Sequence, residues 1–370
     1  MIRLSKPNIS EEAIQEIIKV IRSGYLVQGR YVNDFEESIC NYLNIKNAVV
    51  VSSGTAALHL ALMVLSIKDG DEVIVPAFTF PATANVVELV GAKPVFVDIN
   101  LTDYCIDITK IEDKINPRTK AIIPVHEFGQ AAKMDDIINI AEKYNLKVIE
   151  DAACALGAEF NGRKVGTFGE MGCFSFHPRK AITTGEGGVI VTNNDEVSSK
   201  LRMLRNHGIS NIDGKTDFIV AGLNYRMTDF QAALGFYQMK TLENEITHRV
   251  KMAQEYGKQL SNIKWIKTPE IFKDRRMVYQ TYHILIDGYI RRNSLIQYLK
   301  KHDIEANIGA HALNCTKYYR EKHNLIYDDN PNALISYKRG LALPMGSHIS
   351  LNDIREISKY ILKWGVDYEN

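Results

Sequence analysis

Two kinds of hydrophobic pattern alternate along this chain. Between Ser10 and Gly24, isoleucines recur at the spacing of an amphipathic helix, with Ser10 at its N-cap and Gly24 at its end. Other helical patterns, such as residues 131–144, lie between short apolar runs that are typical of buried strands. Because these runs are nearly continuous in apolar residues, they predict a mainly parallel sheet covered by helices on both faces. The runs are residues 48–51, 72–75, 94–97, 121–125, 146–149, 173–176 and 188–191.

The pattern changes after Thr228. Thr228 and Gln231 have the spacing of a capping box and predict a helix start. We therefore predict a large α/β domain over residues 1–245 and a small α+β domain over residues 246–370, with the N-terminal helix a candidate for packing on the small domain. The small domain is predicted from helix or strand patterns at residues 243–259, 282–286, 293–302 and 351–364.

Composition limits the possible partners. The chain has 370 residues with 45 basic against 44 acidic side chains, so its charge favours neither nucleic acid nor an anionic membrane. Apolar runs such as residues 56–65 are too short to span a bilayer, and the N-terminus lacks the layout of a signal peptide. The five cysteines are scattered and form no C-x-x-C pair. We therefore expect a cytoplasmic protein with reduced thiols and no metal site.

The candidate chemistry lies where strands end, which is where open α/β sheets bind ligands. The strand ending at Val51 runs into Ser52-Ser53-Gly54-Thr55, directly before a helix. Backbone N–H groups and hydroxyls at a helix N-terminus can hold a phosphate. The segment lacks the lysine of a P-loop, and a Ser/Thr-capped helix without a ligand fits it equally well.

Asp151 and Phe80 also follow predicted strands. A carboxylate at this edge can keep a ring nitrogen protonated, although Asp151 could equally cap a helix. Phe80 could stack on a planar ring or fill the core.

Lys180 lies between the apolar run 173–176 and the Gly-rich turn 183–188. An ε-amine held in a partly desolvated pocket can lose its proton near neutral pH and attack a carbonyl. Taken alone, Lys180 also fits a solvated surface charge. A phosphate cradle, an aromatic ring, an aspartate and a lysine at successive strand ends together predict pyridoxal 5′-phosphate chemistry.

The chain closely resembles the sugar aminotransferases of the DegT/DnrJ/EryC1/StrS family, which are fold-type I pyridoxal-phosphate enzymes. The resemblance covers nearly the whole chain and implies a seven-stranded, mainly parallel sheet with a smaller C-terminal domain. Its motifs are Leu4-Ser5-Lys6-Pro7, residues 23–29 and 52–58, Pro124-Val125-His126, Glu150-Asp151-Ala152-Ala153, residues 175–188 and Asn224-Tyr225-Arg226-Met227.

This resemblance implies a role for each matching residue. Lys180 would bond to the cofactor and act as the general acid and base of the proton shift. Asp151 would pair with the pyridine nitrogen. The other implied cofactor contacts are stacking by Phe80 and phosphate binding by Gly54, Thr55 and Ser175.

The family's active site is completed by a second subunit, so the resemblance also implies a homodimer. Asn224 would reach the partner's cofactor phosphate, and Arg226 would meet the donor carboxylate or the sugar nucleotide. Many members carry Gln or His where this chain has Cys154, which forms weaker hydrogen bonds. His177 is a candidate substrate contact and His126 lies at another strand end, but each could instead be a satisfied core histidine.

The implied reaction moves an amino group from L-glutamate to a keto-sugar nucleotide, in the biosynthesis of a glycan or secondary-metabolite sugar. The run 183–188 and the N-terminal motif resemble members that aminate carbon 4 of a 4-keto-6-deoxyhexose. A carbon-3 keto sugar or a cyclitol is an alternative substrate. A dehydratase or a regulatory relative is an alternative function, and Lys180 argues against it because the family's sugar dehydratases carry histidine there.

Overall fold

Seven strands form one central sheet in the computed structural model, which describes residues 1–369. The four pairs from β9 to β4 are parallel, whereas β10 runs antiparallel to both of its neighbours. The predicted mainly parallel, seven-stranded sheet is therefore confirmed. In spatial order the strands are β1 (Asn47–Val51), β10 (Gly188–Thr192), β9 (Met171–Ser175), β6 (Lys147–Asp151), β5 (Thr119–Ile122), β2 (Glu72–Pro76) and β4 (Lys93–Val97).

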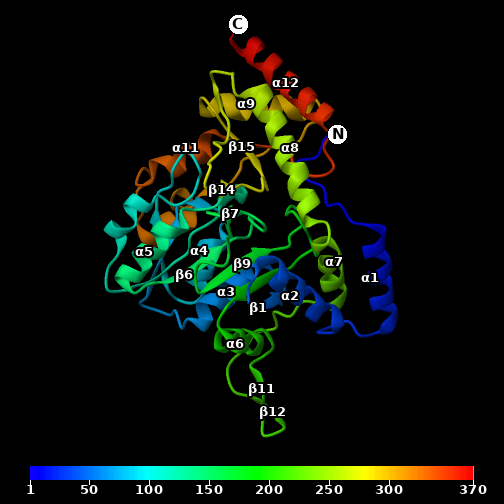
Figure 1. Ribbon diagram of the computed structural model, residues 1–370. Coiled ribbons are helices and arrows are strands. Elements are labelled where there is room, and N and C mark those ends of the chain that lie inside the picture. Colours follow the sequence, from blue (N-terminus) through cyan, green and yellow to red (C-terminus); the bar gives the residue numbers. More distant parts are fainter. Residues whose placement is uncertain (370) are drawn as a thin grey trace.

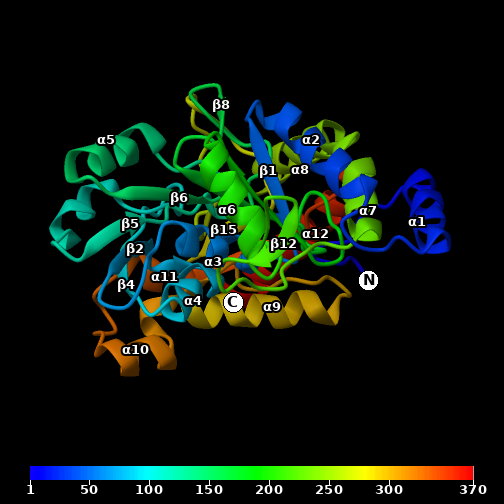
Figure 2. The same ribbon diagram turned by 90° about the horizontal axis from the view of Figure 1, so that it is seen from below.

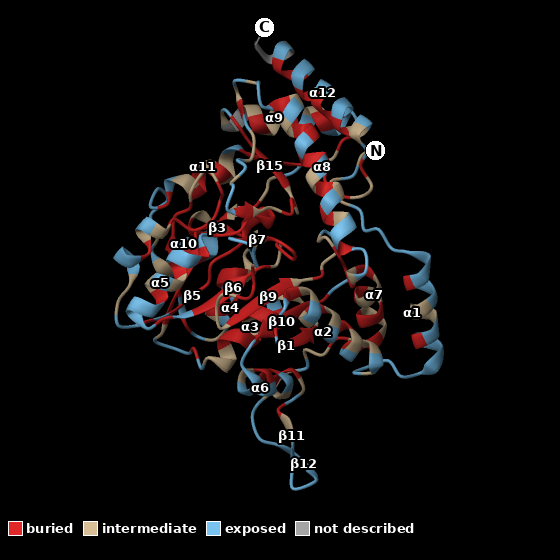
Figure 3. Cartoon of the chain, viewed as in Figure 1, coloured by how far each residue is buried: buried red, intermediate tan, exposed pale blue. Residues whose placement is uncertain are grey.

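Alternate residues of each strand enter two different hydrophobic clusters, one on each face of the sheet. In β1, for example, Val49 and Val51 belong to one cluster and Val50 to the other. Figure 3 shows the sheet as the buried centre of the chain. One face is covered by α2 (Arg30–Leu43), α5 (Met134–Tyr144) and α7 (Asp229–Met239), and the other by α3 (Gly54–Val64), α4 (Ala82–Leu89) and α6 (Asp195–Arg205).

Local signals set several element ends as predicted. The Ser10 hydroxyl caps α1 (Glu11–Ser23), and Gly24 ends it with a φ of 75°. Both hydrogen bonds of the capping box form at the start of α7. The predicted strand over residues 121–125 is shorter than expected, because β5 ends at Ile122 and Val125 makes only an isolated bridge to Asp151.

The C-terminal part has its own core around a three-stranded antiparallel sheet. This sheet has the order β13 (Ile266–Lys267), β15 (Tyr282–Ile286) and β17 (Gly340–Leu343). The helices α9 (Tyr289–Lys301) and α12 (Leu351–Glu369) pack against it, in the upper part of Figure 1. The predicted domain boundary falls inside α8 (Leu242–Leu260), whose first residues join the core of the large sheet while its later residues join the C-terminal core.

The N-terminal helix differs from its expected position. Instead of packing on the small domain, α1 lies beside α7 (Figures 1 and 2). The extended residues before α1 make the contact with the C-terminal part: Ile2 bridges to Ile304, and the Leu4 carbonyl accepts a hydrogen bond of 3.0 Å from the Met345 N–H.

A hairpin of β11 (Ile209–Ile212) and β12 (Lys215–Phe218) projects from the body of the chain and is largely exposed (Figures 1 and 3). Two short strands, β3 (Phe78–Thr79) and β16 (His311–Ala312), pair across the two parts of the chain. Among residues 1–369, no helix has the length and apolar character needed to cross a membrane. The remaining elements are β7 (Glu159–Phe160), β8 (Arg163–Lys164), β14 (Arg275–Arg276), α10 (Lys317–His323) and α11 (Pro331–Arg339).

Candidate active site

A cavity of about 400 Å³ lies at the carboxyl ends of β1, β6 and β9. Most of the predicted site residues line it, together with residues from the N-terminus and the C-terminal part, such as Ser5, Gln280 and Met345. The structure therefore brings most of the predicted residues together in one cavity. The predicted residues in its wall are Gly54, Thr55, Phe80, Asp151, Ser175, His177 and Lys180.

The turn before α3 forms one end of this cavity. The Ser53 hydroxyl accepts a hydrogen bond of 3.0 Å from the Ala56 N–H and so caps the helix. A Cβ on Gly54 would lie 2.8 Å from the Ser175 Cβ, so only glycine allows the turn to approach β9 this closely. Hydroxyls and free N–H groups at the N-terminus of an 11-residue helix fit a phosphate group.

Asp151 ends β6 and is buried. Its carboxylate accepts hydrogen bonds of 2.8 Å from the Thr83 hydroxyl and 3.2 Å from the Ala153 N–H. Burial raises the pKa of Asp151, while these two bonds and the charge of Lys180 oppose that shift. A buried carboxylate in a cavity wall fits a cationic ring nitrogen, which would replace the lost hydration.

Lys180 follows β9 and points toward the segment after Asp151. Its Nζ lies 2.9 Å from the Sγ of Cys154, and its backbone N–H donates to the His177 carbonyl at 2.8 Å. Phe80, with 59% of its surface exposed, does not fill the core and is free to meet a ligand ring. Burial lowers the pKa of His177, which favours the neutral form of its ring.

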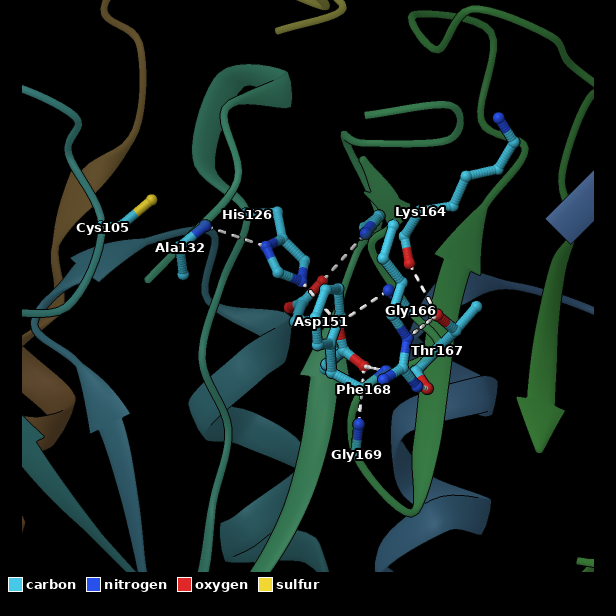
Figure 4. A network of polar contacts seen from close by, with 12 residues as sticks. Cys105, His126, Ala132, Asp151, Lys164, Gly166, Thr167, Phe168 and Gly169 are labelled. Atoms are coloured by element: carbon cyan, nitrogen blue, oxygen red, sulfur yellow. Dashed lines mark hydrogen bonds and ion pairs between the residues drawn. The ribbon is translucent and has the colours of Figure 1, made fainter. Parts of the chain in front are cut away.

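A buried polar network supports the end of β6 (Figure 4). His126 is fully buried and accepts a hydrogen bond from the Ala132 N–H through Nδ1 at 3.1 Å, so its Nε2 carries the proton that Glu150 accepts at 3.0 Å. Glu150 also accepts from the N–H groups of Gly166, Phe168 and Gly169. His126 is therefore a satisfied core histidine that does not line the cavity.

Asn224 and Arg226 do not line the cavity of their own chain. Arg226 makes an isolated bridge to Val51, and its guanidinium donates to the Asn206 side chain at 2.7 Å. The cluster Tyr318-Tyr319-Arg320 lies on α10 outside the cavity, where the Tyr319 hydroxyl contacts Asn85.

The sequence did not reveal three polar residues of the site. Glu127 and Thr79 line the cavity, and Thr83 bonds to Asp151. The signal for Thr79 and Thr83 was their position beside Phe80 after a strand, and Glu127 follows His126 at another strand end.

This fold and site define an aminotransferase that uses pyridoxal 5′-phosphate. The chain belongs to the DegT/DnrJ/EryC1/StrS aminotransferase family, whose profile matches residues 7–362. It is 37% identical to GDP-perosamine synthase of Caulobacter vibrioides over 89% of this chain and 88% of that one. It is 35% identical to UDP-4-amino-4,6-dideoxy-N-acetyl-beta-L-altrosamine transaminase of Campylobacter jejuni over 96% and 95%.

Solved structures agree with this assignment. A putative sugar aminotransferase from Streptococcus pneumoniae, Spr1654 in its PMP form, superimposes with a TM-score of 0.94 at 26% identity, covering 99% of this chain and all of that one. The predictions of family, enzyme class and cofactor are confirmed.

Proposed function

We propose that this aminotransferase moves an amino group from L-glutamate to carbon 4 of a nucleotide-linked 4-keto-6-deoxyhexose. The main support for this proposal is that Lys180 and Asp151 line one cavity with Gly54, which lies in the turn that begins α3. The name of the Campylobacter relative contains a 4-amino-4,6-dideoxy sugar, which supports carbon 4. The names of the two relatives contain GDP and UDP, so the proposal includes substrates with either nucleotide.

Each residue of the cavity would have its own role, which depends on where it lies. Pyridoxal phosphate supplies the electron sink when it is bound. Ser175 and the turn at Gly54 and Thr55 would hold its phosphate, Asp151 would keep its ring nitrogen protonated, and Phe80 would cover its ring. Lys180 would bond to it and, once released, carry the proton between the two carbon atoms of the shift.

We also propose a homodimer that shares its active sites. Val27 bridges to Thr228, and this contact places an exposed apolar segment beside Asn224 and Arg226. Tyr25 has 81% and Val27 51% of its surface exposed. Exposing this apolar surface to water is unfavourable unless a second copy of the chain covers it. Asn224 and Arg226 would then reach the partner's cavity, while His177 is a candidate contact for the sugar from within its own chain.

The test is a transamination screen with purified protein and L-glutamate against 4-keto and 3-keto sugar nucleotides and a keto-cyclitol. We expect an amino sugar from a 4-keto-6-deoxy substrate and, after reconstitution, a visible absorption band that glutamate bleaches. Lys180→Ala is the matched control, since it removes the amine without adding bulk. Turnover of only 3-keto substrates or cyclitols would refute the carbon-4 proposal, and turnover by Lys180→Ala would refute the role of Lys180.

A further inference from the structure

Arg179 is an exposed arginine in the wall of the same cavity, one residue before Lys180. Its backbone is held from two sides: its N–H donates to the His177 Nδ1 at 3.2 Å, and its carbonyl accepts from the Gln280 side chain at 3.1 Å. Both hydrogen bonds that Arg179 makes within residues 1–369 involve its backbone, so its guanidinium has no partner in that range. The structure therefore fixes the backbone of Arg179 and leaves its cationic group available to a ligand.

The wall of the cavity carries few charged side chains, and acids outnumber bases among them. His177 adds no cation, because its Nδ1 accepts the Arg179 N–H, a role that only the neutral ring can fill. An anionic ligand therefore meets a wall in which few side chains can balance its charge. Among the described residues that line the cavity, the acids are Glu127, Asp151 and Glu186, and the bases are Arg179 and Lys180.

The proposed reaction leaves only one of these two bases for the substrate. Lys180 would bond to the cofactor and carry the proton, so it is not available to hold a carboxylate. L-glutamate has two carboxylates, and Arg226 of the second subunit would meet only one of them. The other carboxylate needs a cation of this chain close to Lys180, and Arg179 is the base in the described cavity wall that meets this condition.

We propose that Arg179 determines the choice of amino donor, because it binds the side-chain carboxylate of L-glutamate in this cavity. The proposal rests on the function proposed above and deepens it by naming the residue that selects the donor. A guanidinium presents parallel N–H groups that match a carboxylate, so it distinguishes glutamate from its neutral amide, glutamine. The diphosphate of the sugar nucleotide is the other anion of the reaction, but the hexose ring holds it farther from the reacting carbon.

The first experiment compares Arg179→Gln with the wild type in single turnovers of the cofactor-loaded protein. The rate at which the visible band bleaches is measured against the concentration of L-glutamate and of L-glutamine. We expect Arg179→Gln to weaken the apparent affinity for glutamate by about tenfold or more, because a charge-assisted contact is lost. The limiting rate and the affinity for glutamine should stay within about threefold of the wild type. Arg179→Lys should retain part of the affinity for glutamate, since lysine keeps the charge without the planar fork.

Arg320→Gln is the matched control for this substitution. Arg320 is an exposed arginine on α10 that does not line the cavity, and its side chain also lacks a partner within residues 1–369. Arg320→Gln should match the wild type with both donors. Added salt should reduce the difference between the wild type and Arg179→Gln, because salt screens a contact between exposed charges. The melting temperature checks that each variant is folded.

The second experiment measures binding without turnover, by calorimetric titration of the same proteins with glutarate, UDP and GDP. Glutarate is a dicarboxylate without an amino group, so its affinity reports the carboxylate contact alone. We expect Arg179→Gln to weaken glutarate binding by about tenfold and to change nucleotide binding no more than Arg320→Gln does. An unchanged affinity for glutarate would overturn the proposal, and a loss confined to UDP and GDP would place Arg179 at the diphosphate instead. If glutamate does not bleach the wild type, the proposed function fails, and the glutarate titration still tests the carboxylate contact.

Discussion

Asp151 is held by backbone and side-chain bonds from several segments, which fixes the direction of its carboxylate. Its backbone N–H donates to the Pro124 carbonyl at 2.9 Å, its backbone carbonyl accepts from the His126 N–H at 3.0 Å, and its carboxylate accepts from Thr83 and Ala153. These bonds leave little freedom for the side chain. A charge change at this position should therefore act on chemistry more than on the local fold.

We predict that Asp151→Asn keeps cofactor binding and slows the proton transfer. The amide retains the size and one hydrogen bond but lacks the charge that keeps the ring nitrogen protonated. Loss of one partner of a buried ion pair costs about 3 to 5 kcal/mol, or roughly two to three and a half decades in rate. The measurement is the rate at which glutamate bleaches the visible band in a single turnover. A wild-type rate would mean that Asp151 serves only as the local cap that its sequence also allowed.

Individual site residues differed in how far the sequence could predict them. Gly54, Asp151 and Lys180 could be predicted as candidates because each lies at or after the end of a strand whose apolar pattern is clear. Glu127 could not, because either His126 or Glu127 could have faced the cavity after β5. Which of the two side chains faces the cavity depends on the turn that follows, where Phe128 has a φ of 57°. No residue type in this segment predicts that conformation. The position of Thr79 depends further on β3 pairing with β16, a contact between residues more than 200 positions apart.

The element that we propose to hold the phosphate is the N-terminus of α3, and its position depends on one glycine. We predict that Gly54→Ala weakens cofactor binding by about tenfold or more, because the added Cβ would lie 2.8 Å from the Ser175 Cβ and push the turn away from β9. Cofactor titration followed by absorption measures this loss.

Gly257→Ala is the matched control for that substitution. Gly257 lies inside α8, and a Cβ there would meet nothing within 4 Å. Alanine should leave cofactor affinity unchanged and stabilise the chain by roughly 0.5 to 1 kcal/mol through its higher helix propensity. If Gly54→Ala binds cofactor as tightly as Gly257→Ala, the turn at Gly54 does not form the phosphate site.

At the scale of elements, periodic segments were predictable and isolated ones were not. The long helix predicted over residues 243–259 is α8 with one more residue at each end, since its pattern is repeated over many turns. The hairpin β11–β12 was missed because its strands pair only with each other and show no buried face. Its signal was the dipeptide Asp213-Gly214, both of whose residues have positive φ, as a two-residue hairpin turn requires.

The cavity is a property of the whole molecule, because no single domain encloses it. The strand ends of the large sheet supply Asp151 and Lys180, while Gln280 and Met345 come from the C-terminal part. The Gln280 side chain donates to the Arg179 carbonyl at 3.1 Å, one residue before Lys180. The separation of domains near residue 245 remains a prediction, but the site needs both parts to keep their relative position.

The proposed homodimer can be tested by mixing two inactive variants, because only a shared active site would let them restore activity together. If Arg226 acts in the partner's site, a Lys180→Ala chain and an Arg226→Ala chain should each be nearly inactive, for different reasons. A mixed dimer would contain one site with both defects and one intact site, since Lys180 and Arg226 of a site come from different chains. With equal amounts and free exchange, half of the dimers are mixed, so co-expression should restore about a quarter of the wild-type activity. Cofactor absorption checks that the Arg226→Ala chain still folds. A mixture no more active than its components, or full activity in a monomer by sedimentation, would show that each chain works alone.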